Sequence, residues 1–192
     1  GDSGTLTGTL RQKFFNRVNS SWWLKNTSGQ QVAWWAPNPM INVTKDCPTV
    51  NGQKWYDVLP WFVKNELIDT GYWDGVFYDN VWDDIGFMSG HDIDLNNDGQ
   101  AESVPVLNQK WREGMSILLS NTRNVLGNEA IIMGNGGEYY FKYVNGTLYE
   151  TFPVKGWAET LTKYDFITRN GFEPAIGVLN TNVENTGQQN NY

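Results

Sequence analysis

The chain has 192 residues with 14 basic and 21 acidic side chains, so its formal net charge is -7. This length suits one domain with a substantial core and is too short for an ordinary eight-fold α/β barrel. Lys and Arg form no cluster, so we expect no nucleic-acid partner. No protein partner is predicted. No apolar run is long enough to predict a membrane span, and no signal peptide is recognised at the first residues.

Aromatic residues are unusually frequent, with 10 Trp, 9 Tyr and 9 Phe. Most are expected to pack the core, but several could line a groove, because flat aromatic faces suit the apolar faces of sugar rings. Cys47 and His91 each occur alone. An intrachain disulfide and a site built on paired histidines are therefore excluded, and Cys47 is expected to be buried or incidental.

The predicted elements begin with a hairpin-like segment, in which residues 21–25 and 31–35 flank the turn 26–29. After residue 40, apolar runs alternate with helical patterns, which predicts parallel strands joined by crossover helices. We expect strands at 40–43, 76–81, 130–134, 147–152 and 175–179, and helices between Trp55 and Leu67, between the cap Asn108 and Gly127, and at 157–168.

Polar side chains end the four better strands, at Asp79-Asn80, Asn135, Glu150 and Asn180. The carboxyl ends of parallel strands meet at one edge of a sheet, where ligands bind and catalytic groups lie. A random surface would not place polar residues at the same point of successive units. The sequence therefore predicts a functional site at this edge.

Asp79 and Glu150 are the minimal equipment for cleaving a glycosidic bond. Asp79 would act as nucleophile or stabiliser at the sugar carbon, while Glu150 would protonate the leaving oxygen and then activate water. Because Tyr149 and Phe152 flank Glu150, we expect less polar surroundings there than at Asp79. The alternative is that Asp79 caps the following loop and Glu150 pairs with a lysine or arginine.

Other carboxylates could replace Glu150 as the acid. Glu138, which follows the turn Asn135-Gly136-Gly137, is the strongest competitor. Asp83 and Asp84 lie just beyond Asp79, and there we favour a solvated role in capping the loop.

An Asp-rich loop follows at residues 91–102. Its ligand pattern would be Asp94, Asn96, Asp98, Gln100 and Glu102, with Gly99 at the sharp turn, and hard oxygen ligands at every second residue suit Ca²⁺. The twelfth position is Pro105, so the bidentate carboxylate of a full EF-hand is missing. We expect a structural calcium ion, the alternative being an Asp/Asn-rich turn that holds no ion.

Four segments resemble, in this order, the glycoside-hydrolase-like (β/α)8-barrel proteins of bacteria. They are residues 73–80 (Trp-Asp-Gly-Val-Phe-Tyr-Asp-Asn), the loop 94–102, residues 132–137 (Ile-Met-Gly-Asn-Gly-Gly) and residues 145–152 (Asn-Gly-Thr-Leu-Tyr-Glu-Thr-Phe). The similarity covers most of the chain from about Trp34. The order of the segments is its specific element, and the arrangement is distantly similar to α-galactosidase-type barrels.

The resemblance implies an α/β fold, namely an incomplete TIM-type (β/α) barrel. The predicted strands would be the third to seventh of the barrel, so residues 1–192 would form one domain truncated at both ends. In α-galactosidase-type barrels, carboxylates on the fourth and sixth strands are nucleophile and acid/base, and Asp79 and Glu150 occupy those places.

We therefore expect a glycoside hydrolase that acts on an oligo- or polysaccharide, is secreted or held at the cell surface, and uses no organic cofactor. The residues expected to position the sugar are Trp35, Tyr78, Asn80, Asn135, Glu138 and Asn180. Two alternatives stay open, a non-catalytic carbohydrate-binding domain and a calcium-stabilised structural module.

Overall fold

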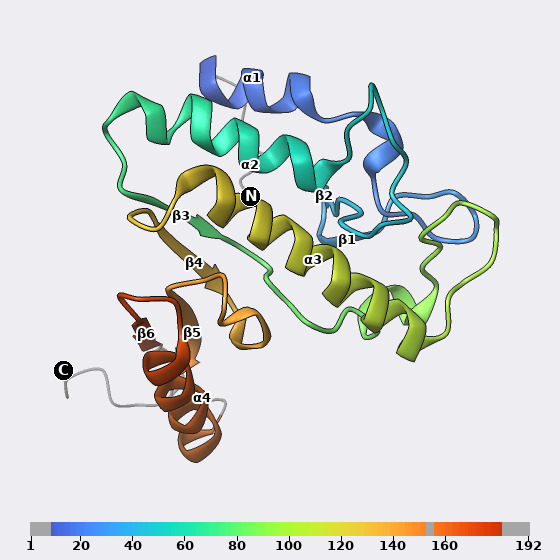
Figure 1. Cartoon of the computed structure of the whole chain (residues 1–192). Helices are drawn as coiled ribbons and strands as arrows, with labels where there is room; N and C mark the ends of the chain where they lie inside the picture. The colour runs from blue at the N-terminus through green and yellow to red at the C-terminus, as the bar shows by residue number, and fades with distance from the viewer. Residues whose placement is uncertain (1–8, 153–155, 182–192) are drawn as a thin grey trace. The chain divides into compact units, whose positions relative to one another are not determined.

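The computed structural model describes residues 9–152 and 156–181, which form a mixed α/β structure (Figure 1). The chain divides into two compact units, one containing the described residues up to Tyr72 together with Asp83–Leu126, and the other Trp73–Trp82 together with the described residues from Gly127 onward. We call them the helical unit and the sheet unit.

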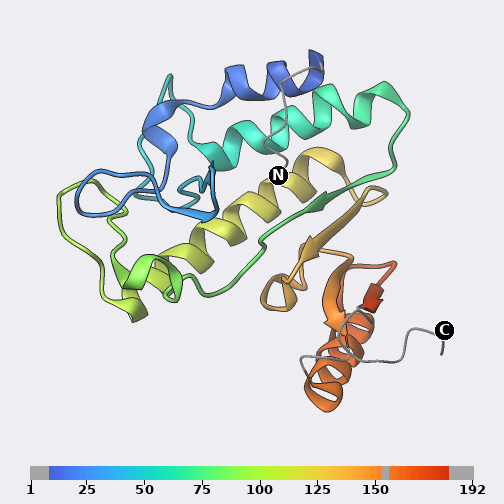
Figure 2. The ribbon, with the colours of Figure 1, turned by 180° about the vertical axis from the view of Figure 1, so that it is seen from behind.

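The helical unit is built on three α-helices. They are α1 (Thr9–Arg17), α2 (Trp55–Glu66) and α3 (Val104–Leu126), with the short 3-10 helices η1 (Ser20–Trp22), η2 (Ile68–Thr70) and η3 (Met88–His91). Figures 1 and 2 show α1 and α3 on either side of α2. The Phe14 ring of α1 lies 5.2 Å from Phe62 and 5.6 Å from Trp55 of α2, edge to face. The sequence pattern predicted α2 and α3 but not α1.

Helix α3 begins four residues before the predicted cap, Asn108. Its start at Val104 places Pro105 in the first turn, where proline costs no hydrogen bond. Asn108 is therefore not the cap. It is buried inside the helix, and its Oδ1 accepts hydrogen bonds from the backbone N–H groups of Ile85 (3.0 Å) and Gly86 (2.9 Å). The predicted end is confirmed, because Gly127 follows α3 with φ +79°.

The predicted strand 40–43 is wrong as a member of the parallel sheet. It lies in the helical unit, where Ile41 forms an isolated antiparallel bridge with Trp23. The backbone N–H of Leu24 donates to Met40 O at 2.9 Å, and Met40 N–H donates to Val32 O at 2.8 Å. The segment has therefore folded onto the hairpin-like segment, which also contains β1 (Ala33–Trp35) paired with β2 (Asn38–Pro39).

The sheet unit contains four parallel strands in the order β3-β4-β5-β6. Their bounds are β3 (Gly75–Tyr78), β4 (Ile131–Asn135), β5 (Gly146–Phe152) and β6 (Ile176–Thr181), with η4 (Glu138–Tyr140) after β4 and α4 (Trp157–Asn170) before β6. All four correspond to predicted strands. Sequential order and parallel direction are what repeated strand-and-crossover units produce.

The two faces of this sheet differ. On one face the Tyr149 ring lies 6.3 Å from the Tyr164 ring of α4, and a Cβ added to Gly177 would meet Tyr164 at 2.4 Å. Figures 1 and 2 show α4 beside β5 in both views. We call this the helix face, and the opposite one the open face.

The open face keeps apolar side chains in contact with solvent. Strand β4 alternates half-buried and buried residues, with Ile132 and Gly134 buried on the helix face. On the open face, Phe77 of β3 is 49% exposed and Val178 of β6 is 40% exposed. The site that the sequence predicts lies at the carboxyl ends of these strands.

Among the described residues, no helix is long and apolar enough to cross a membrane.

Candidate active site

Asp79 follows the last residue of β3 and is exposed at the carboxyl end of that strand. Its Oδ1 accepts hydrogen bonds from Nδ2 of Asn135 at 3.0 Å and from the backbone N–H of Asn80 at 2.9 Å. Asn135 ends β4, the neighbouring strand, and pairing in register brings the two side chains to the same face. Two strand ends thus fix one carboxylate oxygen and leave the other available.

The residue after Asp79 has a left-handed backbone. Asn80 has φ +57°, a region that asparagine tolerates better than other non-glycine residues. The chain then returns to the sheet, because Val81 N–H donates to Asn135 O at 2.9 Å. Such departures cluster at functional sites. The turn presents Asp79 outward while Val81 is buried.

The second predicted carboxylate, Glu150, lies near the carboxyl end of β5 and is exposed. The pairing of β5 with β6 is irregular between Tyr149 and Phe152, because Tyr149 pairs with Leu179 and Phe152 with Thr181. Three steps on β5 thus match two on β6, which is a β-bulge. The extra residue returns Phe152 to the helix face, where its ring lies 4.9 Å from Trp157 of α4.

This bulge overturns the expected surroundings of Glu150. Tyr149 and Phe152 are both buried on the helix face, so neither covers Glu150, which alternation from Tyr149 places on the open face. Tyr149 and Phe152 are close to Glu150 in sequence, but they do not surround its carboxylate. Glu150 is in contact with solvent, as Asp79 is.

The register therefore places three of the polar strand ends on the open face at one edge of the sheet. Asn135 is level with Leu148, and Leu148 is level with Val178, so Glu150 and Asn180 follow on the same side two residues later. Strands β3 and β5 are separated by β4, which puts their backbones about 10 Å apart. A sugar-sized ligand can lie between side chains that project from them.

The register of the sheet does not account for two of the residues expected to contact the sugar. Tyr78 alternates with Asp79 and so projects from the opposite face of β3. Trp35 belongs to the helical unit, where it is 60% exposed at the end of β1. The register of the sheet does not bring either one to Asp79.

Glu138 stands at the start of η4, and its carboxylate is close enough to Tyr149 to help raise the pKa of the phenol. Burial is the larger cause of that shift, and Glu138 comes second. The Tyr149 hydroxyl is buried and makes no hydrogen bond of good geometry among the described residues. Because Tyr149 lies on the helix face, Glu138 is directed to that side, which favours Glu150 as the partner of Asp79.

Sequence reasoning missed Thr147, whose hydroxyl donates towards the carbonyl oxygens of Gly134 (3.1 Å) and Gly136 (2.5 Å). This contact ties β5 to the turn after β4. A Cβ added to Gly134 would come within 2.9 Å of Val81, so glycine lets Val81 pack against that turn. The signal in the sequence that could have identified Thr147 is a polar residue at a position expected to be buried in a strand.

The Asp-rich loop of the helical unit is closed by its own side chains. Asp94 is buried and accepts from Gly99 N–H at 2.8 Å, while Asp98 accepts from Gln100 N–H at 2.9 Å and from the Asn96 amide at 3.0 Å. Glu102 turns away, accepting from Leu95 N–H at 2.9 Å and from Lys110 Nζ at 3.2 Å. No group of three acidic, His or Cys side chains converges as a metal site in the described part of the chain.

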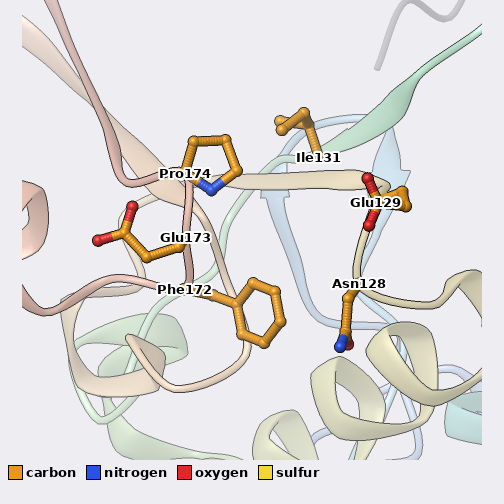
Figure 3. Close-up of a pocket in the computed structure, with 6 residues that line it drawn as sticks. All are labelled: Asn128, Glu129, Ile131, Phe172, Glu173 and Pro174. Carbon is orange, nitrogen blue, oxygen red and sulfur yellow. The ribbon is translucent and has the colours of Figure 1, made fainter.

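The opposite edge of the sheet carries a hollow of about 630 Å³ (Figure 3). The residues that line it lie at or just before the starts of β4 and β6, and they are Asn128, Glu129, Ile131, Phe172, Glu173 and Pro174. Glu129 and Glu173 are exposed and lie on opposite sides of the hollow. No polar groups converge there, so the strand ends at Asp79 remain the better candidate, and these carboxylates provide controls for it.

Comparison with known proteins agrees with a carbohydrate-related role. No curated protein matches the chain. Residues 4–185 match the model of the hypothetical glycosyl hydrolase family 15, and because this match covers nearly the whole sequence, the chain belongs to that family.

Proposed function

We propose that the protein hydrolyses glycosidic bonds of an oligo- or polysaccharide, with Asp79 as nucleophile or stabiliser and Glu150 as acid and base. The proposal is supported by the register of the parallel sheet, from which strand alternation assigns the two side chains to one face and one edge. Family membership supports the carbohydrate substrate. Glycosidases need two carboxylates that flank the scissile bond.

In the proposed reaction, Glu150 donates a proton to the leaving oxygen while positive charge develops on the sugar carbon. Asp79, held by Asn135 through Oδ1, offers its other oxygen to that carbon. Glu150, having lost its proton, then takes one from the attacking water. Exposure of both carboxylates lets substrate and water reach them.

We further propose that the four strands are part of a (β/α) barrel of the kind found in α-galactosidases, with the open face as part of its interior. In such barrels the helices cover the outside of the sheet, as α4 covers the helix face here, and the interior is packed with side chains. Exposed Phe77 and Val178 fit a face that further strands would cover. Calcium in the Asp94 to Glu102 loop, and secretion or surface display, stay predictions.

Hydrolysis of a panel of aryl glycosides and polysaccharides tests the function. The wild-type protein should turn over at least one of them, and Asp79→Asn and Glu150→Gln should each lower the rate by about 10²-fold or more. Glu173→Gln, at the other edge of the sheet, should leave the rate unchanged. Glycan binding with no turnover would contradict hydrolysis and favour a carbohydrate-binding module.

A further inference from the structure

A cluster of exposed aromatic rings lies in the helical unit. Trp34 is 42% exposed, Trp35 60% and Phe87 48%. The Trp34 ring centroid lies 5.8 Å from that of Trp35 and 5.1 Å from that of Phe87, with the planes near right angles in both pairs. We call these three residues the aromatic platform.

The backbone of β1 brings the two tryptophans together. Adjacent residues of a regular strand point to opposite faces, which would separate them. Here Ala33 pairs with Pro39 and Trp35 with Asn38, so β1 contains an irregularity of the bulge type. The hairpin is anchored by Val32, which is buried and donates its N–H to Leu24 O at 2.8 Å.

Phe87 is held as firmly. It lies between Ile85 and Met88, which are 0% and 2% exposed, so the loop is anchored on both sides of an outward ring. Gly86 N–H donates to Asn108 of α3 at 2.9 Å and to Asp84 of the same loop at 2.7 Å. A platform fixed in this way loses little conformational entropy when it binds a ligand.

The chemistry of the surface indicates its ligand. The three aromatic rings offer flat apolar faces, which suit the C–H faces of pyranose rings. The other residues of 33–37 are two alanines and a proline, so no large aliphatic side chain of this segment adds to the surface. Three side chains make a small patch compared with the roughly 800 Å² that each partner contributes to a stable protein interface. The same loop bears exposed Asp83 and Asp84, which would repel a polyanion.

We propose that the aromatic platform of the helical unit is a second carbohydrate site, which binds a neutral polysaccharide chain. The carbohydrate class rests on the proposed function and the family match, whereas binding itself needs no hydrolysis. Neutral glycans should bind, and acidic ones such as polygalacturonate should not.

The test measures dissociation constants of Asp79→Asn protein for a panel of neutral and acidic polysaccharides, by affinity electrophoresis and calorimetry. Trp34→Ala, Trp35→Ala and Phe87→Ala, each in that background, should weaken binding to a neutral glycan by about tenfold. Trp35→Phe should retain most of the affinity. Trp157→Ala is the matched control, because Trp157 is also 60% exposed but lies on α4 of the sheet unit.

Several outcomes would overturn the proposal: no binding to any neutral polysaccharide, equal binding by all variants, or equal binding of acidic polysaccharides. Sedimentation that shows a dimer lost in Trp35→Ala would assign the platform to a second copy of the chain. Binding that is retained by the Asp79→Asn background and lost with the platform supports the inference even if hydrolysis is never found. Circular dichroism spectra confirm that each variant is folded.

Discussion

Asn135 acts on Asp79 through a single hydrogen bond of 3.0 Å. Asn135→Ala removes this donor from a half-buried position, so the carboxylate can rotate away from the reacting carbon. We expect kcat/KM to fall by about ten- to a hundredfold, while the free energy of unfolding changes by about 1 kcal/mol or less. Initial rates and urea unfolding measure the two effects. Unchanged kcat/KM would remove Asn135 from the site.

Cys47 provides a prediction that is independent of catalysis. Burial raises the pKa of its thiol from 9.0 to about 11, although the backbone of Trp55 and the charge of Lys54 act in the other direction. The unfolded chain therefore loses this proton first as the pH rises. The stabilisation is complete below about pH 9 and is lost as pH rises through about 11.

Thiol labelling and unfolding curves check this expectation. Native protein at pH 8 should react with a thiol reagent about a hundredfold more slowly than protein in urea, because the thiolate is scarce and the side chain is buried. The difference in stability between wild type and Cys47→Ala should shrink between pH 9 and 11. A native thiol as reactive as the unfolded one would contradict the burial of Cys47.

Among single residues, the meeting of Asp79 and Asn135 at neighbouring strand ends was predictable, because polar residues at the ends of parallel strands converge by geometry alone. It could not predict the surroundings of Glu150. These depend on one extra residue in β5, and the bulge has no marker in the sequence such as a glycine.

At the scale of elements, β5 and β6 approach each other at a glycine. A Cβ added to Gly146 would lie 1.7 Å from the carbonyl oxygen of Ile176, whereas one added to Gly177 would meet the Tyr164 ring at 2.4 Å. Backbone cannot move aside as a side chain can. Gly146→Ala should therefore lower the free energy of unfolding by more than about 3 kcal/mol, and Gly177→Ala by about 1 to 2 kcal/mol.

Urea unfolding of the two variants measures this difference. Equal losses would mean that the strands can separate at Gly146 without cost, and would contradict the register of β5 with β6.

The strands and helices whose periodicity is strong were predictable, as α2 and β4 show. The stretch 40–43 was not, because its apolar residues suit a parallel strand and an antiparallel partner of the hairpin equally, and only tertiary pairing decides between them. The start of α3 was missed because Asn108, a good cap by type, is used inside the helix to hold the loop at Gly86.

For the whole molecule, the proposed calcium ion would fix the conformation of the long loop within the helical unit. Asp94 is buried and bridged to Asp98 and Gly99, while Glu102 is held by Lys110. If calcium binds, millimolar Ca²⁺ should raise the melting temperature by several degrees over protein in chelator, since a ligand that binds only the folded state stabilises it. Asp94→Asn should abolish the increase.

Equal melting temperatures with calcium and with chelator would assign the loop to the ion-free alternative. Lys110→Ala serves as a further check, because it frees the Glu102 carboxylate without removing a ligand and should not weaken a calcium effect.

The α/β class was predictable for the molecule as a whole, since the alternation of strands and helices produced a parallel sheet, whereas the predicted barrel stays a prediction. The division into two compact units was not, because contacts between distant segments define it.

The central claim is tested most directly by the dependence of hydrolysis on the leaving group. Glu150→Gln should lose about 10²- to 10⁴-fold in kcat/KM on glycosides with poor leaving groups but little on dinitrophenyl glycosides, which need no acid. Asp79→Asn should lose activity on both, and Glu173→Gln on neither. Wild-type rates in Asp79→Asn, or equal losses in Glu150→Gln on good and poor leaving groups, would contradict the assignment of the carboxylate pair.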